Sequence, residues 1–254
     1  MSDSAARPTL GQMLGLARSV AIYYGNPIKT RAMTRFYANL IQPGDLCFDI
    51  GAHVGNRLRA WASLGAQVVG VEPQPLCYWL LQKWYGRNSH ITLLDTAVGA
   101  TAGEATLMVS GKTPTVSTLS QAWIDSVQTV DSFASVEWEG RVQVPVTTLD
   151  ELIAHYGVPA FCKIDVEGYE LEVLQGLSHA PRGLSFEYIP AALDIAQGCI
   201  ERLGQLGDYT YNWSVGEQHR WQRPAPISPT AMQEVLAALP PQANSGDIYA
   251  FHLN

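Results

Sequence analysis

The stretch DIGAHVG, residues 49–55, follows an apolar run at residues 46–50 and precedes a segment with helical periodicity. We predict a β-strand that passes into a helix through this loop. Gly51 permits a tight turn and a close approach of the backbone, and Gly55 lets the start of the helix pack against the sheet. Ligands of open α/β sheets bind at the carboxyl ends of the strands. The stretch therefore predicts an α/β fold with a binding site on this loop.

Further apolar runs of strand length occur along the chain, and such runs are typical of parallel strands that are covered on both faces. Helical patterns separate them, among others at about residues 191–206 and near residues 230–239. Together these patterns predict one sheet of seven strands. They are expected at residues 46–50, 68–72, 91–94, 161–164, 184–188, 209–215 and 247–253.

Residues 99–149 form an insert between the third and fourth of these strands. Residues 103–110 and 141–146 alternate in polarity, as hairpin or edge strands do. The Ser/Thr-rich segment 113–120 between them predicts a mobile loop. Substrate pockets are often built from inserts of this kind. Because residue spacing carries little information in such segments, the sequence does not identify the substrate.

The N-terminal segment differs in charge from the rest of the chain. Residues 8–40 show helical spacing broken at residues 25–27, which predicts two helices with a turn. The first 44 residues carry five basic and one acidic residue, a charge of +4, whereas the other 210 carry 11 basic and 22 acidic residues, a charge of −11. We divide the chain into a helical arm, residues 1–42, and one α/β domain, residues 43–254. The arm is expected to cover the acidic rim of the site or to join a homo-oligomer; the alternative is a solvated extension.

Composition excludes several classes of protein. Of the 254 residues, 47% are hydrophobic and 15% are charged, a balance that supports a sizeable core and not a disordered or fibrous chain. A net charge of −7 argues against nucleic-acid binding through a basic field. The sequence has no run of 18 apolar residues and no secretory signal pattern, so we expect a cytoplasmic protein without membrane insertion. The four cysteines lack metal-ligand spacing, which predicts buried free thiols.

Acidic residues near the glycine loop indicate the kind of ligand. Glu72 ends the second strand 21 residues after Gly51, where an acid can accept hydrogen bonds from both hydroxyls of a ribose. A dinucleotide fold holds pyrophosphate with a third glycine, but here His53 replaces the middle glycine and Asp49 begins the loop. A carboxylate there repels pyrophosphate and suits a cation, such as the sulfonium and amino groups of S-adenosylmethionine. The alternative is that the glycines serve only the turn.

A second group of charged residues lies in KIDVEGYELEVL, residues 163–174. Strand alternation places Lys163 and Asp165 on one face, with Asp165 at the mouth of the site and Glu167 on the loop beyond. Lys163 inside an apolar strand needs a partner, and the nearest candidates are Asp165 and Glu187. For Lys163 we favour a buried ion pair, and for Asp165 a place in the site.

Several blocks of the sequence occur in a recognisable order. They are DIGAHVG, VEP at 71–73, TTLD at 147–150, KIDVEGYELEVL with Gly176 following, FE at 186–187 and GDIYA at 246–250. Together they resemble the FkbM family of S-adenosylmethionine-dependent O-methyltransferases, over about residues 45–253. The resemblance implies a class I, Rossmann-like methyltransferase fold, whose seven-stranded, mostly parallel sheet has the order 3-2-1-4-5-7-6 and an antiparallel last strand. It also implies S-adenosyl-L-methionine as cofactor and methyl transfer to a hydroxyl of a natural product or sugar.

The resemblance also implies contacts to the cofactor, position by position. Where the family more often has Asn, this chain has His53, whose imidazole can also donate a hydrogen bond. The expected contacts are Asp49, Gly51 and Gly55 at the methionine end with Ala52 and His53 in the same loop, Glu72 with Pro73 at the ribose, Asp95, Thr96 and Ala97 at the adenine, and Asp165.

Methyl transfer from a sulfonium needs alignment and removal of the hydroxyl proton. Candidate catalytic residues are Asp165, Glu187 and His219, with Glu167 a further candidate base. His219 has the most suitable ordinary pKa, although it is equally well interpreted as a surface histidine. No ligand spacing predicts a metal site; a metal held by Asp165, Glu187 and His219 is the minority hypothesis.

Two other functions stay open at this stage. One is a nicotinamide-dependent oxidoreductase on a related fold, against which the missing middle glycine and Asp49 count. The other is a nonenzymatic scaffold that binds the cofactor. For the favoured enzyme we expect a small hydroxylated acceptor as partner and no nucleic acid, because the acidic body offers no basic track.

Overall fold

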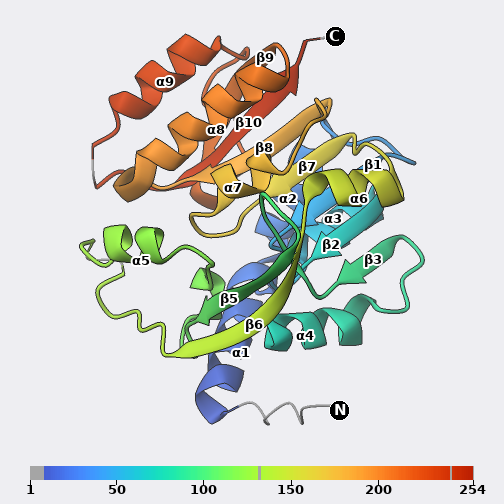
Figure 1. Ribbon diagram of the computed structural model, residues 1–254. Helices are drawn as coiled ribbons and strands as arrows, with labels where there is room; N and C mark the ends of the chain where they lie inside the picture. The colour runs from blue at the N-terminus through green and yellow to red at the C-terminus, as the bar shows by residue number, and fades with distance from the viewer. Residues whose placement is uncertain (1–8, 131–132, 241, 254) are drawn as a thin grey trace.

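The computed structural model describes residues 9–130, 133–240 and 242–253 (Figure 1). Its centre is a seven-stranded sheet in the order β3-β2-β1-β7-β8-β10-β9. All neighbouring strands are parallel except β10, which is antiparallel to both β8 and β9. This confirms the expected strand order, and every predicted strand lies within one residue of its observed bounds. The strands are β1 (Leu46–Ile50), β2 (Gln67–Val71), β3 (Ile91–Leu94), β7 (Phe161–Ile164), β8 (Gly183–Tyr188), β9 (Tyr209–Val215) and β10 (Gly246–His252).

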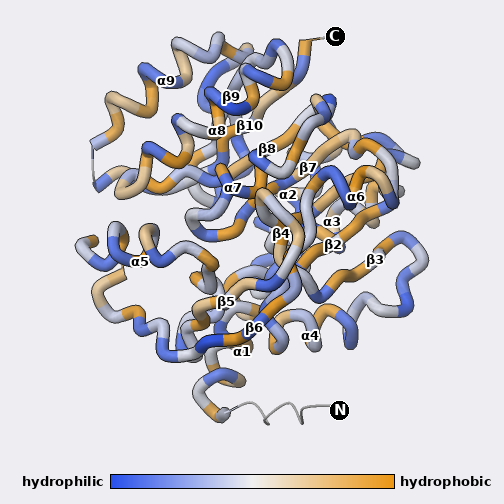
Figure 2. Tube along the Cα trace, in the orientation of Figure 1, coloured by the Kyte–Doolittle hydropathy of each residue, from blue (hydrophilic) through white to orange (hydrophobic). Residues whose placement is uncertain are grey.

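Helices cover both faces of this sheet, which explains why parallel strands such as β2 are buried and largely apolar, whereas Figure 2 shows β9 with a more hydrophilic colour. One face packs on side chains such as Tyr37 and Trp61, and the other on side chains such as Leu174 and Leu203. The first layer contains α2 (Pro27–Tyr37), α3 (Asn56–Ser63) and α4 (Pro75–Tyr85). The second contains α6 (Leu149–Tyr156), α7 (Glu170–Gln175), α8 (Leu193–Leu206) and α9 (Pro229–Ala237).

The insert forms a small sheet of its own, in the order β4-β6-β5. Its strands are β4 (Ala97–Val98), β5 (Gly103–Val109) and β6 (Gly140–Thr147), and α5 (Gln121–Val127) lies between the last two. Figure 1 shows this sheet apart from the central one. The sequence predicted the β5 and β6 strands but not β4, because two residues are too few to show a periodicity. The segment expected to be a mobile loop contains a 3-10 turn, Pro114–Val116, and buries Thr118.

The two N-terminal helices have different positions. α1 (Leu10–Tyr24) packs against α4, whereas α2 places Met33, Phe36 and Tyr37 in the hydrophobic core beneath the sheet. The side chain of Asn26 begins α2 by accepting hydrogen bonds from two backbone N–H groups, so the break at residues 25–27 falls where the sequence predicted it. The core position of α2 shows that it supports the sheet directly.

All four cysteines are buried free thiols, as expected. Within the described part of the chain, no helix has both the length and the apolar character needed to cross a bilayer.

Candidate functional site

A cavity with an empty volume of about 790 Å³ lies at the carboxyl ends of β1, β2 and β7. Its walls come from the β1–α3 loop, the end of β2, the β4 strand, insert residues 114–119 and the β7–α7 loop, with Tyr23 of α1 on one side. The cavity therefore lies where the sequence predicted a ligand, at the end of the strand that leads into DIGAHVG.

The two glycines of the β1–α3 loop are required by contacts within the chain. Gly51 has φ +84°, and a Cβ there would lie 1.9 Å from the backbone oxygen of Asp165. Gly55 has φ +77°, and a Cβ there would collide with Leu81 and Tyr85 of α4. Both glycines permit the close approach that the sequence suggested. In this structure the neighbours are the β7 loop and α4, and only Gly51 also lines the cavity.

Glu72 lies at the end of β2 and is almost fully buried at the cavity wall. One carboxylate oxygen accepts the backbone N–H of His53 at 2.7 Å, and the other accepts that of Gln74 at 2.8 Å. These bonds fix the carboxylate and leave each oxygen a further lone pair. Burial raises the pKa of Glu72 to about 7, although the two N–H donors act in the opposite direction.

His53 lines the cavity in a left-handed backbone conformation, with φ +49°. Its Nε2 atom is buried without a hydrogen-bond partner, and its ring meets that of Tyr23 edge-on at a centroid distance of 5.5 Å. Burial lowers the pKa of His53 to about 4, so the imidazole is neutral at physiological pH. A neutral, unpartnered ring nitrogen at the wall is available to a ligand.

Four of the predicted cofactor contacts do not line the cavity. Asp49 is 2% exposed, its Oδ2 atom has no partner, and burial raises its pKa to about 7. Ala52 is also buried, and Asp95 is exposed to solvent. Gly55, the fourth, packs on α4. The predicted residues that do line the cavity are Gly51, His53, Glu72, Pro73, Thr96, Ala97 and Asp165.

Lys163 is completely buried and forms an ion pair with two carboxylates. Its Nζ atom lies 2.8 Å from Asp247 and 3.1 Å from Asp165. The sequence predicted Asp165 or Glu187 as the partner of Lys163. Asp165 is confirmed, and Glu187 was wrong. Lys163 instead reaches across β8 to β10, because its neighbour in β8 is the small residue Ser185. The ion pair agrees with the structural role that we favoured for Lys163.

Arg57 of α3 completes this charged network. Its guanidinium lies 3.2 Å from Glu217, 3.9 Å from Asp247 and 4.0 Å from Asp165, and its Nε atom has no partner. With Lys163 and Arg57 beside it, the carboxyl of Asp165 keeps its pKa below the ordinary value in spite of burial. Asp165 and Arg57 thus present a fixed negative and a fixed positive charge at the cavity wall.

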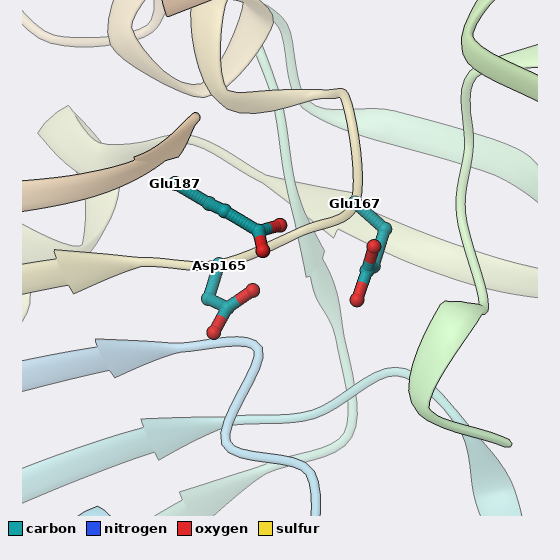
Figure 3. Close-up of side chains that lie close together, drawn as sticks. All are labelled: Asp165, Glu167 and Glu187. Carbon is teal, nitrogen blue, oxygen red and sulfur yellow. The ribbon is translucent and has the colours of Figure 1, made fainter. Parts of the chain in front are cut away.

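Glu167 and Glu187 lie beside Asp165 without such cations. Oxygen atoms of the three carboxyl groups fall within 4.8 Å of one another, and Figure 3 shows all three pointing into a common space. Among the salt bridges of the described residues, none involves Glu167 or Glu187. Burial, followed by the neighbouring carboxylates, raises the pKa of both groups well above the ordinary value.

A second cavity, of about 1400 Å³, opens beside this group of carboxyls. Glu167 and Glu187 form one side, and apolar residues such as Phe133 and Ile189 form another. Glu167 also lines the first cavity, so it stands on the border between the two. The loop holds it there in a left-handed conformation, with φ +54°. Thr118 donates a hydrogen bond to its backbone oxygen at 2.6 Å.

Oxygen ligands of this kind suit a hard divalent cation. The structure gathers Asp165, Glu167 and Glu187, whereas the minority metal hypothesis named His219 in place of Glu167. His219 lies elsewhere: its ring packs against Phe36 and Tyr37, and its Nδ1 atom is 3.0 Å from the backbone oxygen of Glu217. It lines neither cavity, and burial lowers its pKa. This position separates His219 from the other candidate bases.

Sequence reasoning missed three residues of the site, each brought in by tertiary packing. Arg57 follows the glycine loop by two residues, and a charged residue at the buried start of a helix was a usable signal. Asp247 was visible as an acid at the start of the last strand. Tyr23 gave no signal, because nothing local distinguishes it from the other aromatic residues of α1.

Comparison with known proteins identifies the family. The chain resembles the TehB-like SAM-dependent methyltransferase of Corynebacterium glutamicum, with TM-score 0.46, 10% identity and coverage of 93% of this chain and 94% of that one. It resembles precorrin-6y C5,15-methyltransferase of Geobacter metallireducens, with TM-score 0.43, 14% identity and coverage of 88% and 87%. It also resembles the plantazolicin methyltransferase BpumL, solved with S-adenosylhomocysteine and a desmethyl plantazolicin analog, with TM-score 0.44, 10% identity and coverage of 94% and 90%.

The search of curated proteins found no match. A family model, the methyltransferase FkbM domain, matches residues 49–190, which is more than half of the chain and includes both DIGAHVG and KIDVEGYELEVL. The chain therefore belongs to the FkbM family of methyltransferases.

Proposed function

We propose that this protein transfers the methyl group of S-adenosylmethionine to a hydroxyl of a small molecule, such as a natural product or a sugar unit. The observation that carries the proposal is the position of Glu167 on the border of two cavities, one beside the glycine loop and one lined by Glu187 and apolar side chains. A carboxyl at that border stands between the methyl donor and an acceptor. Its raised pKa suits the removal of a hydroxyl proton.

The first cavity fits the cofactor in both charge and shape. Asp165 and Arg57 offer opposite charges to the ammonium and carboxylate of the methionine part. The free lone pairs of Glu72 suit the two ribose hydroxyls, and apolar residues Val98 and Leu107 suit a flat base. When bound, the cofactor supplies an electrophilic methyl group. The protein's own residues orient it and exclude water.

The second cavity suits the acceptor. Its entrance is open, its walls combine apolar with polar side chains, and its inner end carries Glu167 and Glu187. Glu167 contributes to the raised pKa of Glu187, and the oxygens of the two carboxyls lie close together, so a proton held by one can be donated in a hydrogen bond while the other accepts one. We assign proton removal to Glu167 and acceptor positioning to Glu187. Asp165, held by Lys163, is too acidic for the base, and His219 is outside the cavities.

Calorimetric titration with S-adenosylhomocysteine tests the cofactor site. We expect micromolar binding to the wild-type protein and at least a tenfold loss in Glu72→Ala, because that carboxylate lies at the wall. Asp95→Ala is the matched control, since Asp95 is exposed and outside the cavity. Equal affinity of Glu72→Ala and wild type would overturn this assignment. Tighter binding of NAD than of S-adenosylhomocysteine would favour the oxidoreductase alternative.

Methyl transfer itself is tested with labelled S-adenosylmethionine and a panel of hydroxylated natural products and sugars. Turnover should appear on a hydroxyl and persist in chelator, because the proposed base is a carboxyl and no metal is invoked. Activity lost in chelator and restored by Mg²⁺ would assign Asp165, Glu167 and Glu187 to a metal. Cofactor binding without transfer to any acceptor would contradict the proposal and favour the scaffold alternative.

A further inference from the structure

Exposed apolar side chains gather on two adjacent helices. Of the nine large hydrophobic residues that are exposed in the described part of the chain, six lie on α1 and α4. Leu10 is 77% exposed, Leu14 is 62% exposed and Trp79 is 48% exposed. The six are Leu10, Met13, Leu14, Ile22, Trp79 and Trp84, and we refer to them with their basic neighbours as the α1–α4 surface. Isolated apolar residues on a surface need no explanation, but a group of this size does.

The two helices lie side by side, so their exposed residues form one surface. The Tyr24 ring meets that of Trp84 at 5.3 Å, and its hydroxyl lies 2.7 Å from that of Tyr85. Leu16 of α1 and Leu80 of α4 share a buried cluster between the helices. Figure 1 shows both helices at the lower edge of the molecule, beneath the central sheet.

The exposed face of α1 has a regular pattern. Leu10, Leu14, Arg18 and Ile22 follow one another at intervals of four, which places them along one side of the helix. Gly15, Leu16 and Ser19 are buried on the opposite side. On α4, Trp79 and Lys83 show the same interval of four. Each helix therefore presents apolar residues together with a basic one.

All charges on this surface have the same sign. The sequences of α1, α2, α3 and α4 contain no Asp or Glu, although the whole chain has a net charge of −7. The exposed basic residues on or beside the surface are Arg18, Arg59, Lys83 and Arg87, and Arg59 lies over the Tyr24 ring at 6.0 Å. In the insert that packs on Gly15 of α1, Glu137 pairs with Lys112, and Glu139 accepts the Gly111 N–H.

We propose that the α1–α4 surface binds an anionic lipid surface peripherally, with Leu, Ile and Trp side chains at the level of the headgroups. Basic residues next to exposed Trp and aliphatic side chains are typical of segments that lie in the membrane interface. A second copy of this chain fits less well, because a twofold contact would bring the basic surface of one copy against that of the other with no acid in either helix to offset the charge. The sign of the charge selects an anionic partner.

Peripheral binding of this kind would use α1 and α4, which contain no acidic residue. The basic helices would face the lipid, and the acidic remainder of the chain would face away from it. Tyr23, on the same helix, lines the cofactor cavity, so the docked surface adjoins the site.

Vesicle flotation of the full chain tests the inference. We expect binding to vesicles of phosphatidylcholine with 30% phosphatidylglycerol and at least tenfold weaker binding to phosphatidylcholine alone. Arg18→Gln with Lys83→Gln should weaken binding roughly 25-fold, since each basic residue near an anionic surface contributes about fivefold. Leu14→Ser with Ile22→Ser should weaken it at low salt as well, because the apolar contacts are lost.

Matched controls keep folding and charge effects apart. Arg223→Gln removes an exposed basic residue elsewhere, and Leu253→Ser removes an exposed apolar one; both should bind vesicles as wild type does. S-adenosylhomocysteine affinity and thermal unfolding verify that each variant is folded, and they test the enzyme proposal separately. Equal binding to both vesicle types, or to neither, overturns the inference. The inference is also overturned if the wild-type chain binds no vesicles but self-associates, and if Leu14→Ser with Ile22→Ser abolishes that self-association.

Discussion

Three neighbouring carboxyl groups of one site differ in their ionisation because their partners differ. Asp165 has Lys163 at 3.1 Å and Arg57 at 4.0 Å, and these cations keep its pKa low. Glu167 and Glu187 form no salt bridge among the described residues, and burial, followed by neighbouring carboxylates, raises their pKa values. Neighbouring acids with different pKa values are typical of sites in which one group binds and another transfers a proton.

This difference predicts the pH dependence of methyl transfer. Because Glu167 must lose its proton before it can act as a base, turnover under saturating cofactor should rise as the pH passes through its raised pKa. Glu167→Gln should lower kcat about 10²- to 10⁴-fold and remove that rise. Its S-adenosylhomocysteine affinity should stay within a few-fold of wild type.

Glu234→Gln, on the exposed side of α9, is the control for the loss of one acid. Initial rates between pH 6 and pH 9 provide the measurement. A Glu167→Gln protein that keeps both its rate and its pH profile would show that the base lies elsewhere.

Asp49 gives a prediction about stability. Its pKa is about 7 in the folded chain and 3.8 in the unfolded one, so the folded state holds the proton more tightly. Such a group stabilises the fold at low pH, and its contribution is lost as the pH rises towards 7. The free energy of unfolding of wild type, relative to Asp49→Asn, should therefore fall by about 2 kcal/mol between pH 5.5 and pH 8.

Urea unfolding at the two pH values measures this difference. Asp208→Asn, which changes an exposed acid, is the control and should show no such trend relative to wild type. A pH-independent difference between wild type and Asp49→Asn would mean that Asp49 is ionised in the folded protein.

Much of the site was predictable residue by residue. Glu72, His53 and Asp165 each follow directly from the end of a strand, so local sequence fixes their position at the rim. Asp49 was expected at the cofactor because it precedes the glycine loop. Strand alternation instead directs the Asp49 side chain into the interior of the protein, on the same face of the sheet as Lys163, its neighbour in the β1–β7 register.

At the level of elements, α1 forms a wall of the site and α2 forms part of the core. Gly15 of α1 lies against the insert, where a Cβ would come within 2.9 Å of the backbone oxygens of Gly111 and Lys112. Tyr24 donates a hydrogen bond to the backbone oxygen of Val54, in the glycine loop. α1 therefore touches both the insert and the cofactor loop, and its packing contributes to the shape of the cavity.

Two truncations separate these roles. Removal of residues 1–25 should leave a folded protein with weaker S-adenosylhomocysteine binding, because Tyr23 and the bond to Val54 are lost. Removal of residues 1–40 should destabilise the whole protein, because Met33, Phe36 and Tyr37 leave the core.

Circular dichroism and calorimetric titration distinguish the two outcomes. If the protein without residues 1–25 keeps full affinity for S-adenosylhomocysteine, α1 has no part in the site. That result would favour the alternative interpretation of the arm as a solvated extension.

Across the whole molecule, one ligand site connects segments that are far apart in the sequence. Tyr23, Glu72, Thr118 and Asp165 line the same cavity, although they come from the N-terminal helix, the central sheet and the insert. Binding energy is shared among all segments that the ligand contacts. The cavity should therefore behave as one unit when the cofactor binds.

Hydrogen exchange with and without S-adenosylhomocysteine measures that coupling. Protection should increase together in residues 51–55, 114–119 and 165–169 and at the end of α1. α9, which lines neither cavity, should exchange as before and is the internal control. Protection confined to residues 51–55 would contradict a shared site.

The sequence by itself determined the alternation of strands and helices, the ends of the seven strands and the family, because these depend on local periodicity and on residues close together in the chain. Only the tertiary structure decided which charges meet. Lys163 pairs with Asp247, 84 positions away, because β10 enters the sheet between β8 and β9. The same packing sets Glu167 and Glu187 side by side and separates His219 from them. Contacts across strands and layers depend on how side chains from distant segments pack together, and no local pattern records that packing.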